Sequence, residues 1–334
     1  MDNNIVVSIA VLTYNHEQYI REALDSILMQ QVDFQYEVVV GDDCSKDETR
    51  VILQTYERNF PRIFKVIYRD KNIGPTNNLY DVFMHCDGQY IAQLEGDDFW
   101  TDPHKLQKQV EFLEANERYI GVAHSCDVLC DDIALKVAYE ALYDCREGAV
   151  FEFNDYKKKP FAGHTCTLVY KNIYSNGKLN YNILYEADNF IGDQTINLLL
   201  VMQGEVFCMA SKMSTYRLVS KAGSSNFASQ SLESNPLKHR WSYLNKLEEY
   251  CLHNGGEPLI NVDKRTEYLI ESLKRLIKSF NQIDYEVFAY FAKMVFRFPS
   301  ILLHIPPYIL KQVKASLRSS RLKREMAVTM KSRN

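Results

Sequence analysis

The residues with the clearest chemical potential are the three carboxylates of Glu95-Gly96-Asp97-Asp98. They follow Tyr90–Leu94, a short and mostly apolar run of the kind that forms a buried strand. Carboxylates gathered at the end of a buried strand repel one another and lose hydration, so folding alone gives no reason for them. A hard divalent cation gives a reason, because Mg²⁺ and Mn²⁺ prefer carboxylate oxygens. The run therefore predicts a metal site, with a solvated turn as the plainer alternative.

Gly96 adds to this prediction, because a residue without a side chain would let a phosphate or a sugar approach the backbone. The expected arrangement is strand, acidic edge and helix, as at the carboxyl end of a strand in an open α/β sheet.

The same order of strand, turn and helix recurs from the start of the chain, about every 25 to 30 residues. Apolar runs at residues 5–12, 36–41, 63–69 and 90–94 each precede a polar turn, and helical spacing of apolar residues follows the turns. This order is typical of right-handed βαβ units on a parallel sheet. The carboxyl ends of parallel strands share one edge, so the turns are expected to line one crevice.

The turns carry residues of complementary chemistry. They are Thr13, Tyr14 and Asn15 after the first strand, Asp42 and Asp43 after the second, Arg69 to Gly74 after the third, and Glu95 to Asp98 after the fourth. Asn15 is also expected to cap the first helix. An aromatic face, a carboxylate pair, a cation and a metal site are what a nucleoside diphosphate needs. Neither G-x-G-x-x-G nor G-x-x-x-x-G-K-[ST] occurs, which argues against dinucleotide and P-loop sites.

Composition and charge limit the class of protein. The 334 residues carry a net charge of −4, which does not point to nucleic acid as a partner. The charge is uneven, because residues 311–334 hold eight Lys or Arg and the single acid Glu325. The eight cysteines are scattered without zinc-site spacing and indicate reduced, buried thiols in a cytoplasmic protein. No segment has the length of a signal peptide or a membrane span.

The motifs together resemble the family 2 glycosyltransferases of GT-A fold. The resemblance rests on V-S-I-A-V-L-T-Y-N-H, G-D-D-C-S-K-D-E-T, N-I-G and G-Q-Y-I-A-Q-L-E-G-D-D-F-W-T-D-P, in order over residues 5 to 115. It is weaker from 120 to 220 and absent beyond. It implies an α/β, Rossmann-like catalytic domain over residues 1–225, with a mixed, mainly parallel sheet flanked by helices. A C-terminal α-helical extension would occupy residues 226–334.

The resemblance also implies roles for single residues. The implied donor-binding set is Thr13, Tyr14 and Asn15 around the base, Asp43 with Asp42 on the base, Arg69 near the diphosphate, Arg217 near the diphosphate or the metal, Asp97 at the ribose or sugar, and Glu95 as the first acid of the D-x-D-type motif. Asp98, together with Asp97, would bind Mn²⁺ or Mg²⁺. Glu95 stands where Asp is common, which lengthens the carboxylate. The family often follows Tyr-Arg with a histidine two positions on, but Val219 occupies that position here.

The catalytic base is expected in the second hundred residues, where strands are predicted at 120–129, 161–170 and 205–218. The resemblance places the base at Asp193, with Asp188 as the fallback. A helix dipole would favour an acid at Asp193 in any case, so a structural role stays open. His164 is interpreted as a satisfied histidine of the core or rim.

The C-terminal third is helical in pattern, with an apolar run at 301–310 before the basic tail. It predicts either an amphipathic anchor on the anionic inner face of a membrane or a helical hairpin packed on the catalytic domain. Residues 221–231 are small and polar and predict a loop that closes over the donor, or an inert linker.

The functional hypothesis is inverting transfer of a sugar from a nucleotide sugar, most simply a UDP-sugar, to a saccharide or lipid-linked saccharide acceptor. Surface polysaccharide assembly, such as capsule or O-antigen, would fit, with the enzyme in the cytoplasm or at the inner face of the membrane. The alternatives are a sugar nucleotidyltransferase, which would need a Gly-rich phosphate loop after the first strand, and a non-catalytic nucleotide-sugar-binding module of the same fold.

Overall fold

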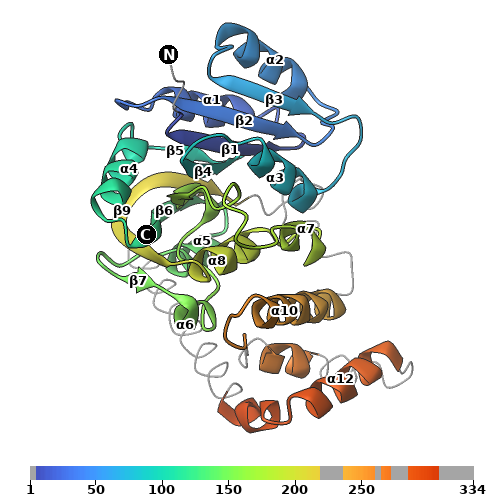
Figure 1. The fold of residues 1–334 in the computed structure, drawn as a ribbon. Coiled ribbons are helices and arrows are strands. Elements are labelled where there is room, and N and C mark those ends of the chain that lie inside the picture. The colour runs from blue at the N-terminus through green and yellow to red at the C-terminus, as the bar shows by residue number, and fades with distance from the viewer. Residues whose placement is uncertain (1–4, 219–235, 260–264, 272–284, 308–334) are drawn as a thin grey trace, which may run out of the picture. The chain divides into compact units, whose positions relative to one another are not determined.

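The structure, a computed structural model, describes residues 5–218, 236–259, 265–271 and 285–307 (Figure 1). The chain divides into two compact units. The first comprises Met1–Ser234 and Lys246–Pro258, and the second comprises Asn235–Asn245 and Leu259–Asn334. The domain boundary at residue 225 stays a prediction from the sequence, and residues 246–258 lie in the first compact unit.

The first unit is built on a nine-stranded mixed sheet with the order β3-β2-β1-β4-β8-β6-β9-β5, and β7 pairs with β9 (Figure 1). The strands are β1 (Val7–Thr13), β2 (Tyr36–Asp42), β3 (Phe64–Tyr68), β4 (Tyr90–Glu95), β5 (Phe99–Trp100), β6 (Tyr119–Leu129), β7 (Val150–Phe151), β8 (Val169–Lys171) and β9 (Glu205–Arg217). The first four are mutually parallel, β8 runs antiparallel between β4 and β6, and β9 is parallel to β6. The predicted fold class is confirmed.

The helices of this unit follow the strands in the predicted alternation. They are α1 (Ile20–Leu28), α2 (Thr49–Asn59), α3 (Pro75–Met84), α4 (Lys105–Ala115), α5 (Ile133–Leu142), α6 (Phe153–Tyr156), the 3₁₀ turn η1 (Thr165–Thr167), α7 (Ile183–Glu186) and α8 (Asp193–Val201). Helix α10 (Pro236–His253) contributes residues to both units, and α12 (Tyr285–Arg297) lies in the second.

The two faces of the parallel half of the sheet are covered by different helices. Alternate residues of β1 (Val7, Ile9 and Val11) share one buried cluster with apolar residues of α1, α2 and α4. The opposite face meets α3, since a Cβ placed on Gly41 would lie 2.5 Å from Asn78 Oδ1 and 2.6 Å from Val82 Cγ2. The sheet is therefore buried on both faces, which explains the continuous apolar runs of its strands.

The register of the parallel strands sets their carboxyl ends level with one another. Thr13 lies opposite Asp42, and Leu12 lies opposite Glu95. Strand β8 enters the sheet from the same edge, because it is antiparallel to β4 with Val169 opposite Ala92. The residues just before β8 therefore share an edge with the residues just after β4, and the register agrees with the prediction that the strand ends meet at one edge.

Two local expectations were wrong. Of the strand predicted at 161–170, only Val169 and Tyr170 form β8, because His164 caps η1 and turns the chain before the sheet begins. Asn15 does not cap α1, whose N-cap residue is Tyr19. Asn15 instead adopts a left-handed conformation with φ 55°, and its side chain accepts a hydrogen bond from Lys46 N.

The C-terminal third was predicted to be helical, and the second unit contains the helix α12 (Tyr285–Arg297). Its core holds Arg265, a fully buried cation whose guanidinium lies 4.4 Å from the ring centre of Trp241 and 4.2 Å from that of Phe298. The described helices include none that is long and apolar enough to cross a membrane. The predicted donor loop at 221–231 and the basic tail lie outside the described residues.

Gly41→Ala tests whether the close approach of α3 to β2 is required. The added methyl would overlap Asn78 and Val82, so we expect a loss of about 1–3 kcal/mol in the free energy of unfolding. Urea unfolding followed by circular dichroism measures it. Gln54→Ala, on the exposed side of α2, is the control and should change stability by less than about 0.5 kcal/mol. Equal stability of the two variants would show that α3 shifts without cost.

Candidate active site

Asp98 is the most buried acid of the loop that follows β4, with 1% of its surface exposed. Its Oδ1 accepts a hydrogen bond of 2.8 Å from Arg217 N at the end of β9. Its Oδ2 has no hydrogen-bond partner among the residues described, and it lies 3.6 Å from His164 Nδ1. A carboxylate oxygen left in this state is a ligand for a cation or a proton.

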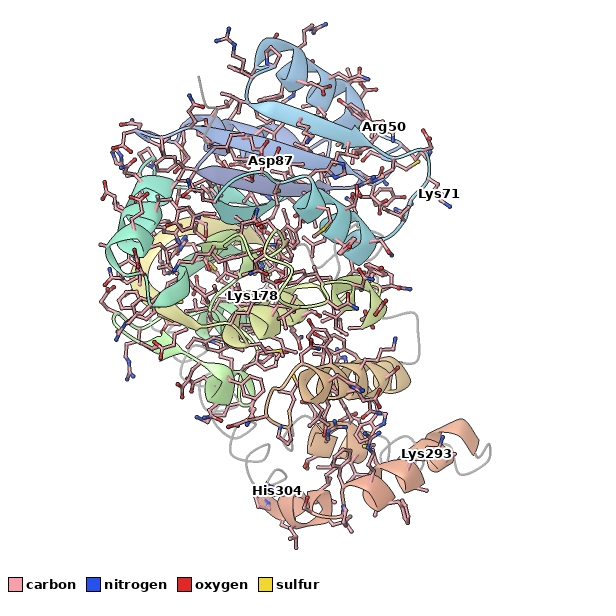
Figure 2. The ribbon with its side chains drawn as sticks, viewed as in Figure 1. Arg50, Lys71, Asp87, Lys178, Lys293 and His304 are labelled. Atoms are coloured by element: carbon pink, nitrogen blue, oxygen red, sulfur yellow. The ribbon has the colours of Figure 1, made fainter. Side chains whose placement is uncertain are left out.

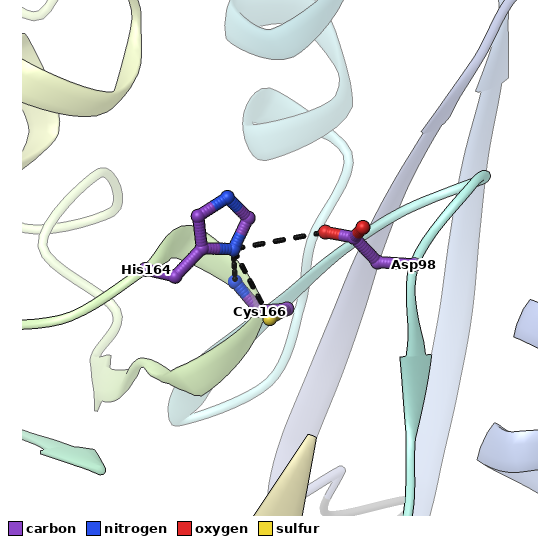
Figure 3. Close-up of side chains that lie close together, drawn as sticks. All are labelled: Asp98, His164 and Cys166. Carbon is purple, nitrogen blue, oxygen red and sulfur yellow. Dashed lines mark hydrogen bonds and ion pairs between the residues drawn. The ribbon is translucent and has the colours of Figure 1, made fainter. Parts of the chain in front are cut away.

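His164 and Cys166 lie beside Asp98 because the turn η1 precedes β8 (Figure 3). The His164 ring stacks on Tyr216 of β9 at 4.1 Å between centres, and its edge meets Tyr143 at 4.8 Å. Its Nδ1 lies 3.1 Å from Cys166 Sγ and accepts the Cys166 amide at 3.4 Å. Sequence reasoning assigned His164 to the core or rim, and it missed that this side chain faces the acid loop.

The acids of the loop raise one another's pKa. Burial, followed by the charges of Asp97 and Asp193, raises the pKa of Glu95 to about 8. Burial is also the largest cause of the raised pKa of Asp98, with further contributions from Cys166, Asp97 and Glu95. The folded protein therefore holds this cluster at an electrostatic cost, which a bound cation would remove.

Asp193 is the first residue of α8 and joins this cluster electrostatically, since its charge raises the pKa of Glu95. Burial raises the pKa of Asp193, while the Gln194 amide, which donates a 2.7 Å hydrogen bond to Oδ1, opposes this effect. Asp188, the fallback base, is buried and accepts the backbone amides of Phe190 and Ile191. Asp188 thus has a clear structural role in its turn, and Asp193 is the better placed of the two.

The loop after β1 packs directly on Gly96. A Cβ there would lie 2.8 Å from His16 Nδ1 and 2.9 Å from Thr13 Oγ1. The expectation that Gly96 makes room for a ligand is therefore wrong on the side where its Cβ would point, because atoms of Thr13 and His16 fill that space. Thr13 Oγ1 and His16 Nδ1 are both buried without a hydrogen-bond partner among the described residues, while Tyr14 is half-buried.

Asp43 and Asp42 have different environments. The Asp43 carboxylate accepts the amides of Ile73 (2.7 Å) and Gly74 (3.0 Å) and so holds the loop that precedes α3. Asp42 is fully buried and pairs with Arg50 of α2 at 2.6 Å. Figure 2 labels Arg50 among the side chains of the first unit. Asp42 therefore supports the site from inside the protein, whereas the oxygens of Asp43 keep lone pairs for a further donor.

The two arginines predicted near the diphosphate both have partners within the protein. Arg69 pairs with Asp81 of α3. Arg217 pairs with Glu22, and its Nε donates to the Asp97 carbonyl oxygen at 2.9 Å. Arg217 thus holds the acid loop, residues 95–98, through its backbone amide and its side chain. Val219, the position where the family often has a histidine, lies outside the described residues.

Comparison with known proteins agrees with this geometry. The model of the family "Glycosyl transferase family 2" matches residues 8–187, more than half of the chain. An uncharacterized protein of Mycobacterium tuberculosis is 42% identical over 126 residues, which are 38% of this chain and 36% of the relative. TuaG of Bacillus subtilis, whose name assigns it to teichuronic acid biosynthesis, is 38% identical over 108 residues, 32% of this chain and 42% of TuaG.

Among solved structures, TarS residues 1–349 of S. aureus in complex with UDP-GlcNAc aligns with a TM-score of 0.60 and 17% identity, covering 89% of this chain and 81% of that one. At this identity the likeness establishes a shared fold, which is GT-A. The chain belongs to glycosyl transferase family 2. It spans less than half the length of these curated relatives.

The raised pKa of Glu95 predicts a dependence of stability on pH. Between the ordinary pKa of about 4.5 and the folded value of about 8, the folded protein binds more protons than the unfolded chain, so stability falls as pH rises. We expect Glu95→Gln to remove about 1–2 kcal/mol of this loss, an estimate reduced because Glu95 is half-buried. Urea unfolding at several pH values, with a chelator present, measures it. Glu114→Gln, exposed on α4, should leave the slope unchanged; equal slopes for all three proteins would contradict the prediction.

Proposed function

We propose that the enzyme transfers a sugar, with inversion, from a nucleotide-diphospho-sugar to a saccharide acceptor. The observation that carries the proposal is that Asp98, which has an unsatisfied buried oxygen, and Asp193, the first residue of α8, both interact electrostatically with Glu95 at the end of β4. The first group suits a cation that holds the diphosphate. The second suits a base that activates the acceptor.

The donor lies, in this proposal, across the loops at the carboxyl ends of β1, β2 and β4. Tyr14 and Asn15 cover the base, and the Asp43 carboxylate accepts its imide N–H. Thr13 offers a hydroxyl to the donor. Asp97 faces the ribose or sugar, and Asp98 holds Mn²⁺ or Mg²⁺. UDP is proposed as the nucleotide, because the imide N–H of uracil can donate to the Asp43 carboxylate and because TarS, which shares the fold, was solved with UDP-GlcNAc.

The reaction requires one proton acceptor and one leaving group. A hydroxyl of the acceptor attacks the anomeric carbon on the face opposite the diphosphate, and its proton passes to the Asp193 carboxylate. The bond between the anomeric carbon and the diphosphate oxygen breaks, and the nucleoside diphosphate leaves. A bound cation would supply charge neutralisation at the diphosphate. Burial supports the role of Asp193, because a raised pKa makes a carboxylate a stronger base.

A group of aromatic side chains supports the proposal that the acceptor is a saccharide. Tyr143 and Tyr216 meet His164, and Tyr139 of α5 contacts both tyrosines with ring centres 6.1 Å and 6.0 Å away. Aromatic rings suit the apolar faces of sugars. Together with the name of TuaG, this supports a saccharide acceptor in surface polysaccharide biosynthesis. Capsule and O-antigen remain the specific proposals from the sequence.

The two alternatives make different predictions. A sugar nucleotidyltransferase would need a phosphate loop after β1, and this loop is occupied by packing on Gly96. A non-catalytic binding module would bind nucleotide sugars without turnover. The sugar transferase is favoured because the acids of the β4 loop and α8 are held together at an electrostatic cost.

Asp193→Asn tests the base. We expect the rate of nucleoside diphosphate release from a matching donor to fall by about 10²–10⁴-fold, while donor binding changes little. The assay screens UDP-, GDP- and dTDP-sugars with Mn²⁺ or Mg²⁺, and a thermal shift reports donor binding. Asp188→Asn is the matched control, because asparagine keeps the oxygen that accepts Phe190 N and Ile191 N.

Unchanged turnover in Asp193→Asn, with turnover lost in Asp188→Asn, would move the base to Asp188. Donor-induced stabilisation without turnover in the unaltered enzyme would favour the binding module. The absence of any shift with every donor would contradict the nucleotide site itself.

We further propose that the second unit contacts the cytoplasmic face of a membrane. Phe296 of α12 is 91% exposed and Leu303 is 78% exposed, and residues 311–334 carry eight basic side chains. Exposed apolar side chains near a basic segment are what an interfacial anchor presents to anionic lipid. The alternative from the sequence is a helical hairpin packed on the catalytic domain, with a solvated tail.

Vesicle sedimentation distinguishes the membrane anchor from the helical hairpin. We expect Phe296→Ser combined with Leu303→Ser to weaken binding of the full chain to phosphatidylglycerol-containing vesicles by about tenfold or more. Val51→Ser, at a 55% exposed apolar residue of α2, is the control and should bind as the unaltered protein does. Equal binding of both variants would contradict the anchor.

A further inference from the structure

Three potential ligand atoms meet at one point beside the acid loop. They are Asp98 Oδ2, His164 Nδ1 and Cys166 Sγ, and all lie within 4.8 Å of one another (Figure 3). Nδ1 is 3.6 Å from Oδ2 and 3.1 Å from Sγ. Ligands of a tetrahedral ion with bonds of 2.0–2.3 Å lie roughly 3.3–3.8 Å apart. Small side-chain movements, in which Nδ1 exchanges its 3.4 Å hydrogen bond with the Cys166 amide for the ion, would therefore seat an ion between them.

The three side chains are fixed by the surrounding protein. Asp98 is 1% exposed, His164 is 6% exposed and Cys166 is fully buried. The Tyr216 ring sets the plane of the imidazole, and Cys166 Sγ lies 3.2 Å from Ser214 Oγ. A ready-made arrangement of this kind lowers the entropy that ligands lose when an ion binds.

The turn η1, which carries His164 and Cys166, is also held in place by a side chain of α4. Gln109 of α4 donates to the carbonyl oxygens of Thr167 (2.9 Å) and Val122 (3.3 Å), and its own oxygen accepts from Lys105 Nζ at 2.8 Å. The position of His164 and Cys166 is thus set by α4 and β6 as well as by β8. The unsatisfied Asp98 oxygen is the independent sign that the arrangement awaits a ligand.

We propose that Asp98 Oδ2, His164 Nδ1 and Cys166 Sγ together form a divalent transition-metal site that discriminates against Mg²⁺. An oxygen, nitrogen and sulfur donor set suits Zn²⁺, Co²⁺ and, less tightly, Mn²⁺, whereas Mg²⁺ prefers oxygen alone. The Cys166 thiol gives up its proton to solvent as the ion binds. The inference rests on the proposed function in one respect, because it takes this ion to be the one beside the donor diphosphate.

Cobalt binding to the full, metal-free chain tests the site directly. Co²⁺ should produce a thiolate-to-cobalt charge-transfer band in the near ultraviolet, and a hundredfold excess of Mg²⁺ should not remove it. Cys166→Ser should abolish the band. His164→Asn should weaken Co²⁺ binding by about tenfold or more, while the asparagine oxygen can still accept the Cys166 amide and preserve the turn. Cys86→Ser is the matched control, because Cys86 is a buried thiol like Cys166 but lies outside the donor set, where it donates to the Val82 carbonyl oxygen.

The outcomes separate this inference from the proposed function. A band that persists in Cys166→Ser, or full competition by equimolar Mg²⁺, would overturn the three-donor site. Sugar transfer by the unaltered enzyme with Mg²⁺ and Mn²⁺ alike, without the cobalt band, would overturn the site and leave the proposed function standing. The cobalt band without turnover of any nucleotide sugar would support the site and count against the function.

Discussion

The architecture depends on confining carboxylates to the end of one buried strand. Glu95 ends β4, Asp97 and Asp98 follow it, and burial raises the pKa of Glu95 and Asp98. A chain that gathers acids at such a place needs contacts that hold them there. Arg217 provides them, because its amide binds the Asp98 carboxylate and its side chain binds the Asp97 carbonyl oxygen. The strand β9 that carries Arg217 is thus part of the site although it lies more than a hundred residues away in the sequence.

Strand direction decides what else reaches this edge. Parallel strands bring the ends of β1, β2 and β4 together, while the antiparallel β8 brings the residues that precede it. An antiparallel strand inside a parallel sheet therefore delivers a different segment, the turn with His164 and Cys166, to the same place. The carboxylates of the site come from the carboxyl end of β4, whereas the imidazole nitrogen of His164 and the sulfur of Cys166 come from the residues that precede β8.

Most of the fold was predictable, because β1 to β4 are continuous apolar runs and each ends in polar residues. The placement of Thr13, Asp43 and Asp98 on one edge followed from that pattern and is confirmed. Partnerships between distant segments were not predictable. The pairing of Asp42 with Arg50 and of Arg69 with Asp81, the filling of the space beside Gly96, and the position of Cys166 all depend on tertiary contacts that spacing does not encode.

These partnerships change how a diphosphate would be accommodated. Arg69 and Arg217 already pair with Asp81 and Glu22, so their charges are largely neutralised before a donor arrives. The β4 loop adds carboxyl groups to this edge. A diphosphate that approached the edge alone would therefore meet acidic groups with little compensating positive charge. A cation bound to Asp98 reverses the local field, and on this argument the donor enters as its metal complex or after the metal, and not before it.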